Sequence, residues 1–188
     1  LAIDPDTADM ESARKIWQRL YLKTKNNPFL RAELNQWYIQ KEVCSGNLSR
    51  IGELSKISPE TARCMSELDA ADLFLNNIKE LSPSEIKYLC QWDGKWLCLN
   101  GVHTLSPSVA EYLFQWKGEW ISLNGLSEFP PDRAKYLVQW EGKQLELMGL
   151  QDIPNIADRQ TLTYLAEWEK AGGKLFVPHH IRNLMDQL

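Results

Sequence analysis

The sequence predicts an α/β repeat solenoid, in which short strands and helices alternate and the strands form one parallel sheet. Two observations carry this prediction. The segment Tyr-Leu-x-Gln-Trp-x-Gly occupies residues 88–94, 112–118 and 136–142, so it recurs every 24 residues. Between its copies lies a second recurring segment, Leu-x-Leu-Asn-Gly or a close variant, as at residues 97–101 and 121–125. Self-similarity at a fixed period of about 20 to 50 residues is the signature of repeat architectures.

Each Leu-x-Leu segment predicts a short strand, because residues that alternate in polarity fit a half-buried strand. We expect the glycine that follows to adopt a positive φ, which lets the chain leave the strand sharply. The expected strands lie at residues 73–75, 97–99, 121–123, 145–147 and 175–177. Residues 51–59 are a degenerate first copy of the strand segment.

A helix is expected after each strand. Serine-proline pairs at residues 58–59, 82–83 and 106–107 combine a serine N-cap with proline at the first helical position. Glu85 stands three residues after Ser82, where a capping box requires it. Apolar residues then recur at helical spacing through the tryptophan. We expect the glycine two residues later to end a helix of about three turns.

One strand and one helix are too small to bury their own apolar face, whereas stacked units form a continuous core. We therefore expect about five units over residues 48–180, with a parallel sheet and helices on its convex side. Residues 1–47 predict an α-helical N-terminal cap, with one helix over residues 9–23 and a second that starts at residues 27–28. Residues 181–188 predict a C-terminal closing helix.

The spacing changes once, near the C-terminus. Trp168 follows Trp140 by 28 residues instead of 24, which predicts one extra helical turn within residues 157–170. The two glycines at residues 172–173 are then expected to lead back to the last strand, and Pro178 to end it.

The residues Leu97, Leu99, Val102 and Leu105, spaced Leu-x-Leu-x-x-Val-x-x-Leu, resemble the core of leucine-rich repeats. The Ala-x-x-Leu of the helices resembles the helical half of bacterial-type short repeats. The resemblance covers roughly residues 50–180 and implies an architecture rather than a particular function. The sequence departs from that family where it usually buries an asparagine, because these positions are apolar here: Ile78, Val102, Leu126 and Leu150.

Composition argues against several function classes. The net charge of −4 argues against a general nucleic-acid-binding surface, which needs a basic excess. No stretch approaches the roughly 18 apolar residues of a membrane-spanning helix, so we expect no membrane insertion. The chain starts at Leu1, with Asp4 and Asp6 close behind, which is unlike a signal peptide and suggests a piece of a longer protein. We expect a cytoplasmic monomer or weak homodimer, with a secreted effector as the alternative.

The cysteines give no sign of a chemical site. Cys44, Cys64, Cys90 and Cys98 show neither paired metal-ligand spacing nor a dense disulfide framework. Reduced thiols are the simplest interpretation, and a disulfide between scattered cysteines is the alternative. No His-Asp arrangement is readable near Cys44 or Cys98, and the one pair of adjacent histidines points in different directions. We therefore expect no catalytic residue, no metal and no cofactor.

The remaining candidate site is the open face of the sheet. If the leucines of each strand point inward, alternation turns the residues between them outward. Trp96 and Trp120 then lie side by side and could anchor a partner. The alternative is a structural role, in which they stabilise the sheet as cross-strand neighbours or the cap folds over them. The predicted partner-binding residues are Phe74, Trp96, Cys98, Asn100, Trp120, Ser122, Asn124, Glu146 and Phe176.

The sequence thus predicts a non-catalytic module that binds a protein partner through the concave sheet face. The alternative is a targeting or scaffold region of a larger protein, such as a bacterial effector, whose catalytic domain lies outside this chain. Asn76, Asn100 and Asn124 are either a binding row or an internal hydrogen-bond ladder. The column of tyrosines and tryptophans that begins at Tyr88 and Trp92 is expected in the core rather than as a ligand-stacking ladder.

Overall fold

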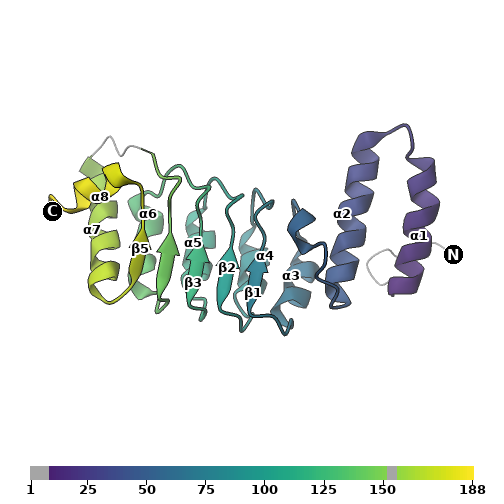
Figure 1. Ribbon diagram of the computed structural model, residues 1–188, viewed down its shortest axis with the longest axis horizontal. Helices are drawn as coiled ribbons and strands as arrows, with labels where there is room; N and C mark the ends of the chain where they lie inside the picture. Colours follow the sequence, from purple (N-terminus) through teal and green to yellow (C-terminus); the bar gives the residue numbers. More distant parts are fainter. Residues whose placement is uncertain (1–8, 152–155) are drawn as a thin grey trace.

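The computed structural model describes residues 9–151 and 156–188 and has an elongated α/β fold (Figure 1). Residues 1–8 of the expected cap therefore lie outside the described residues. The helices are α1 (Met10–Lys23), α2 (Pro28–Cys44), α3 (Pro59–Ser66), α4 (Pro83–Leu89), α5 (Pro107–Leu113), α6 (Pro131–Ala134), α7 (Ile156–Lys170) and α8 (His179–Met185), with 3-10 turns η1 (Ile51–Glu53) and η2 (Leu137–Gln139). The strands are β1 (Asp72–Phe74), β2 (Trp96–Cys98), β3 (Trp120–Ser122), β4 (Gln144–Glu146) and β5 (Lys174–Phe176).

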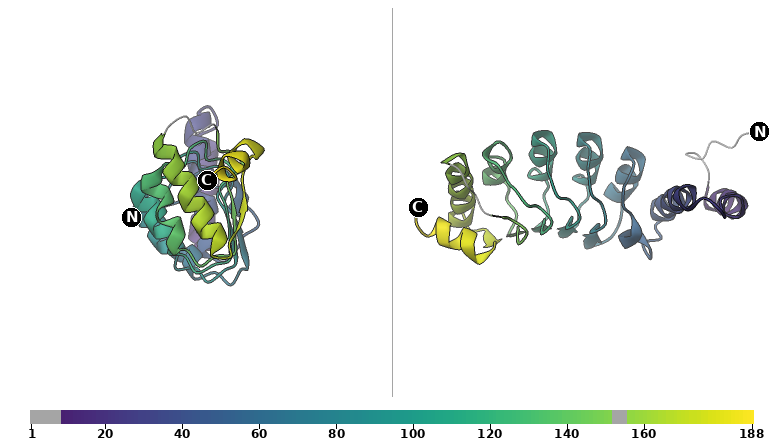
Figure 2. Two further views of the ribbon diagram at one scale, coloured as in Figure 1. Left: turned by 90° about the vertical axis from the view of Figure 1, so that its left-hand side faces the viewer. Right: turned by 90° about the horizontal axis from the view of Figure 1, so that it is seen from above.

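The five strands form one parallel sheet in which the spatial order equals the chain order, β1-β2-β3-β4-β5. Corresponding residues of successive units face each other, so that Trp96 pairs with Trp120 and Leu97 with Ile121. The view from above in Figure 2 shows the helices along one side of the strands. The predicted α/β fold with a parallel sheet is confirmed, because each strand reaches the next through a helix on the same side.

Serine caps start the helices as predicted. The side chains of Ser58, Ser82 and Ser106 accept a hydrogen bond from the backbone N–H three residues on, and proline follows each of them. The Glu85 carboxylate closes the capping box by accepting the backbone N–H of Ser82 at 2.7 Å. The predicted length of three turns is wrong. Helices α4 and α5 have seven residues each, about two turns, and end before the tryptophan.

Trp92, Trp116 and Trp140 follow a helix or 3-10 turn and lie in the turn that leads back to the sheet, whereas Trp168 lies within α7. The indole of Trp92 is buried against Gly94, where an added Cβ would lie 1.9 Å from the ring. The glycine two residues after the tryptophan is therefore required by packing, and the prediction that it ends the helix is wrong. Nε1 of Trp116 donates to the carbonyl oxygen of Trp92 at 2.9 Å, and Trp140 and Trp168 repeat this bond at 3.0 Å each. This tryptophan column is part of the core, as expected.

The glycines after the strands also serve close packing between units. Only Gly46 and Gly172 have a positive φ among the residues that the structure describes, so the positive φ expected after the strands is wrong. An added Cβ at Gly125 would instead lie 2.2 Å from the backbone oxygen of Asn100 in the preceding unit. Glycine is needed at this position because it lets two backbones approach closely.

The first unit differs from those that follow. Residues 51–59, expected as a worn copy of the strand segment, contain η1 and no strand. Leu54 and Ile57 are nevertheless buried in the same core cluster as Leu73 of β1. The segment thus contributes apolar side chains to the core without joining the ladder of the sheet.

The last unit is also different. Helix α7 has 15 residues against seven in α5, which is about two turns more. The four inserted residues account for about one turn, as expected, and the rest arises because the segment up to Trp168 and Lys170 is helical here. Strand β5 ends before Pro178, as predicted. Arg182 of α8 donates to the carbonyl oxygen of Leu175 at 2.8 Å and pairs with Glu169 at 2.6 Å. The guanidinium group thus hydrogen-bonds a backbone carbonyl on the outer edge of β5, the edge that faces away from β4.

Helices α1 and α2 form an antiparallel hairpin at the N-terminal end (Figure 1). Trp17 holds the hairpin together, because its Nε1 donates to Oδ1 of Asn35 at 3.0 Å and its ring stacks on Tyr21 and contacts Tyr38. The start of α2 is fixed by Asn27, whose side chain accepts the backbone N–H of Leu30. Both expected cap helices are therefore present.

A disulfide joins α2 to the first repeat helix. Cys44 at the end of α2 and Cys64 in α3 are bonded, with Cα atoms 5.0 Å apart. The expectation of four reduced thiols is wrong for this pair, because packing of α2 on α3 brings together two cysteines that have no recognisable spacing in the sequence. Cys90 and Cys98 remain free.

Substitution Gly125→Ala should lower the free energy of unfolding by about 2 kcal/mol or more, because the new methyl group meets a backbone oxygen that cannot move alone. Urea unfolding followed by circular dichroism measures this change. Gly52→Ala is the matched control, since no heavy atom lies within 4 Å of an added Cβ there. Equal losses in both variants would contradict the packing role of Gly125.

The double variant Cys44→Ser/Cys64→Ser should lose about 3 kcal/mol of stability, the loop-closure entropy expected for a disulfide that spans 20 residues. Thermal unfolding with and without dithiothreitol tests this. The reductant should lower the melting temperature of the wild-type chain and leave that of the variant unchanged. A wild-type chain that is insensitive to reductant would show that the two thiols are not bonded.

Candidate interaction surface

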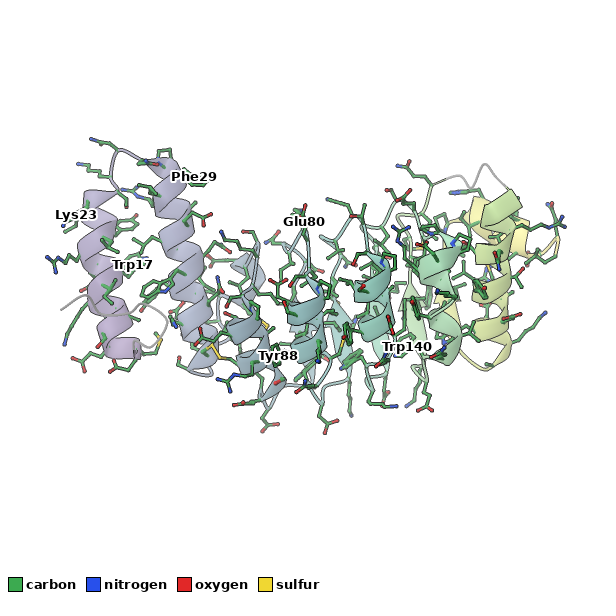
Figure 3. The ribbon with its side chains drawn as sticks, turned by 180° about the vertical axis from the view of Figure 1, so that it is seen from behind. Trp17, Lys23, Phe29, Glu80, Tyr88 and Trp140 are labelled. Atoms are coloured by element: carbon green, nitrogen blue, oxygen red, sulfur yellow. A yellow bond between two sulfur atoms is a disulfide. The ribbon has the colours of Figure 1, made fainter. Side chains whose placement is uncertain are left out.

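We call the sheet face opposite the helices, which is turned to the viewer in Figure 1, the open face. It carries three rows of side chains. The helices lie on the other side, as the view from behind in Figure 3 shows. The first row is Asp72, Trp96, Trp120, Gln144 and Lys174; the second row is Phe74, Cys98, Ser122, Glu146 and Phe176. The third row, just beyond the strands, is Asn76, Asn100, Asn124 and Met148.

Three aromatic side chains lie together over β1, β2 and β3. The rings of Trp96 and Trp120 stack with centroids 4.1 Å apart and an interplanar angle of 5°. Phe74 meets Trp96 edge-on at 5.6 Å and is 45% exposed. The Nε1 atoms of both tryptophans are buried, and neither has a hydrogen-bond partner in the part of the chain that the structure describes. A buried donor without an acceptor costs about 1–3 kcal/mol, so these rings retain an unmet capacity to donate.

A polar cluster adjoins the aromatic side chains and is centred on Glu146. Its Oε2 accepts hydrogen bonds from Ser122 Oγ at 2.9 Å and from Asn124 Nδ2 at 3.0 Å, and its Oε1 accepts one from Gln144 Nε2 at 3.2 Å. The Ser122 hydroxyl also lies 2.8 Å from Oδ1 of Asn100, so its single hydrogen is shared between two acceptors. These bonds hold the side chains of the cluster in fixed positions.

The asparagines of the third row form a hydrogen-bond ladder between units. Oδ1 of Asn76 accepts the backbone N–H of Asn100 at 3.2 Å, and Oδ1 of Asn100 accepts that of Asn124 at 2.8 Å. The ladder ends where Asn124 accepts the backbone N–H of Met148 at 2.9 Å. Of the two interpretations that the sequence left open, the geometry shows the internal ladder.

The predicted partner-binding residues share one face but differ in exposure. Cys98 is only 4% exposed and Ser122 only 1%, so the expectation that both are exposed is wrong. Longer side chains on neighbouring strands close over these small ones. Phe176 lies on β5 beneath the ammonium of Lys174, 4.9 Å from its ring centroid, and is separated from the aromatic side chains by β4.

Sequence reasoning omitted Gln144 from the predicted binding residues. Gln144 pairs in register with Trp120 and donates to Glu146, so it lies where the aromatic and polar parts of the face meet. The 24-residue period carried the signal, because it aligns Gln144 with Trp96 and Trp120.

The free thiols are not arranged for nucleophilic chemistry. Burial raises the pKa of the Cys90 thiol to about 12, and burial together with the nearby Glu146 and Asp72 carboxylates raises that of Cys98 to about 11. The thiolate is the reactive form, so both groups stay protonated at neutral pH. Within residues 9–151 and 156–188, no three His, Cys, Asp or Glu side chains form a group that could hold a metal ion.

Comparison of the chain with protein-family models, with curated proteins and with solved structures found no match. No helix in the described part of the chain is long and apolar enough to cross a bilayer.

Native protein should react slowly with iodoacetamide at Cys98. Raising the thiol pKa from 9.0 to about 11 lowers the thiolate fraction at neutral pH about 100-fold. Mass spectrometry of the alkylated peptide should show a rate that rises about tenfold per pH unit up to that pKa. Rapid labelling of Cys98 in the folded chain, at the rate seen in urea, would contradict its burial.

Proposed function

We propose that the chain is a leucine-rich-repeat-like solenoid and a non-catalytic module that binds a protein partner through its open face, the concave side of the sheet. The observation that carries this proposal is the stacked pair Trp96 and Trp120 beside the exposed Phe74. Tryptophan and other large aromatic side chains are enriched at the centres of protein interfaces.

The energetics of the tryptophan pair support a partner. Both rings are only partly buried, so part of their apolar surface stays in contact with water. A partner that covers the rings removes this apolar surface from water, which favours binding.

The layout of the face supports an amphiphilic partner. Aromatic side chains cover β1 to β3, and the fixed polar cluster around Glu146 follows on β3 and β4. A partner segment with an apolar group over Trp96 and a hydrogen-bond donor toward Glu146 matches this order. Because the polar cluster is already hydrogen-bonded internally, it is organised before binding, which lowers the entropic cost of association.

The variant Trp96→Ala/Trp120→Ala should weaken partner binding by at least about 30-fold, since loss of a hot-spot side chain costs about 2 kcal/mol or more. Its readout is photocrosslinking in lysate, with benzoylphenylalanine placed at position 74. One discrete crosslinked protein should appear and should disappear in the tryptophan variant. Circular dichroism and thermal unfolding establish that the variant is folded.

The matched control carries the photocrosslinker at position 138, where Val138 is 42% exposed and lies in η2, outside the open face. It should give none of the crosslinked product formed at position 74. Identical products from both positions, or a product at position 74 that survives loss of both tryptophans, would exclude the open face as the binding surface.

A further inference from the structure

A second exposed apolar surface lies at the tip of the α1–α2 hairpin, far along the molecule from the central strands (Figure 1). We define the hairpin tip as five exposed residues: Leu22, Lys23, Lys25, Phe29 and Leu30. Leu22 is 77% exposed, Phe29 70% and Leu30 50%. They belong to the last turn of α1 and the first turn of α2, on either side of the connecting turn.

These apolar side chains lie outside the core cluster of the molecule. Trp17 lies between the two helices and makes the ring contacts to Tyr21 and Tyr38, whereas Phe29 lies at the N-terminal end of α2 (Figure 3). The connecting turn is nevertheless well fixed. The backbone N–H of Asn27 donates a hydrogen bond to the carbonyl oxygen of Thr24 at 2.9 Å. The tip therefore presents apolar groups from a defined turn.

The hairpin also differs in charge from the rest of the chain. Residues 9–31 contain six lysines and arginines but only two aspartates and glutamates. The whole chain, by contrast, contains 21 lysines and arginines and 25 aspartates and glutamates. In the part of the chain that the structure describes, Lys23 and Lys25 at the tip and Arg19 one turn before it form no salt bridge. The tip thus combines uncompensated positive charge with exposed leucine and phenylalanine.

We propose that the hairpin tip binds the surface of an anionic lipid bilayer. Leu22, Phe29 and Leu30 enter the interface between headgroups and acyl chains, while Lys23 and Lys25 contact the anionic headgroups. Basic residues beside exposed apolar ones are the combination that attaches proteins to such surfaces without spanning them. This surface is separate from the open face and does not depend on it.

The shape of the tip favours a bilayer over a protein. The turn between α1 and α2 stands above α3 and β1 in Figure 1, and the apolar side chains on either side of it are exposed. A protein partner would need a complementary hollow, whereas a fluid lipid interface accommodates a convex tip of any outline. The positive charge matches the negative surface potential of anionic membranes.

Sedimentation with vesicles tests the proposal. The wild-type chain should bind vesicles of phosphatidylcholine with about 30% phosphatidylserine, and bind pure phosphatidylcholine vesicles much more weakly. Lys23→Gln/Lys25→Gln should reduce the partition coefficient about 30-fold, since each lysine contributes about fivefold. Leu22→Ser/Phe29→Ser should reduce it by at least about tenfold.

Lys87→Gln/Lys170→Gln is the matched control, because it removes the same charge from exposed positions on α4 and α7. It should bind like the wild-type chain. If the serine variant fails to fold, the lysine variant decides, since it removes no apolar contact. No binding to anionic vesicles, or equal loss in the tip and control variants, would overturn the proposal. Binding to polyglutamate but not to vesicles would overturn it in favour of an acidic protein partner.

Discussion

The hydrogen bond from a tryptophan Nε1 to the main-chain carbonyl of the preceding tryptophan is the constraint on which the arrangement of the units depends. A buried indole N–H without an acceptor is costly, and from Trp116 onward in this column the acceptor lies one unit back, as from Trp116 to Trp92. The ring also lies against the glycine two residues later, as Trp116 does against Gly118, and this contact restricts the path of the turn. The turn leads into the next strand, in which Trp120 pairs with Trp96.

Much of the fold is readable from the sequence because its signals are local. Alternating leucines located the strands, and serine-proline pairs located the helix starts. The helix ends were not readable, because Trp92 lies at helical spacing after Leu89 although it packs on Gly94 from the turn. The role of Gly125 was not readable because its contact is with Asn100 of another unit, 25 residues away.

The candidate site was predictable in part. Alternation placed Trp96 and Trp120 on one face, but the burial of Ser122 depends on how far side chains of three strands reach across one another. The polar cluster around Glu146 is likewise a property of the assembled sheet. The basic hairpin escaped notice because a net charge of −4 averages over the whole chain.

The Asn100 ladder has a consequence for how such a chain can grow. Each of its bonds in the middle of the sheet joins a residue to the one 24 positions later, as do the indole bonds from Trp116 and Trp140. Duplication of a 24-residue segment within this region would recreate every bond at both new junctions, whereas an insertion of another length would break them. Lengthening by a whole 24-residue module would thus preserve the bonds between units and leave the contact of Arg182 with the edge strand in place.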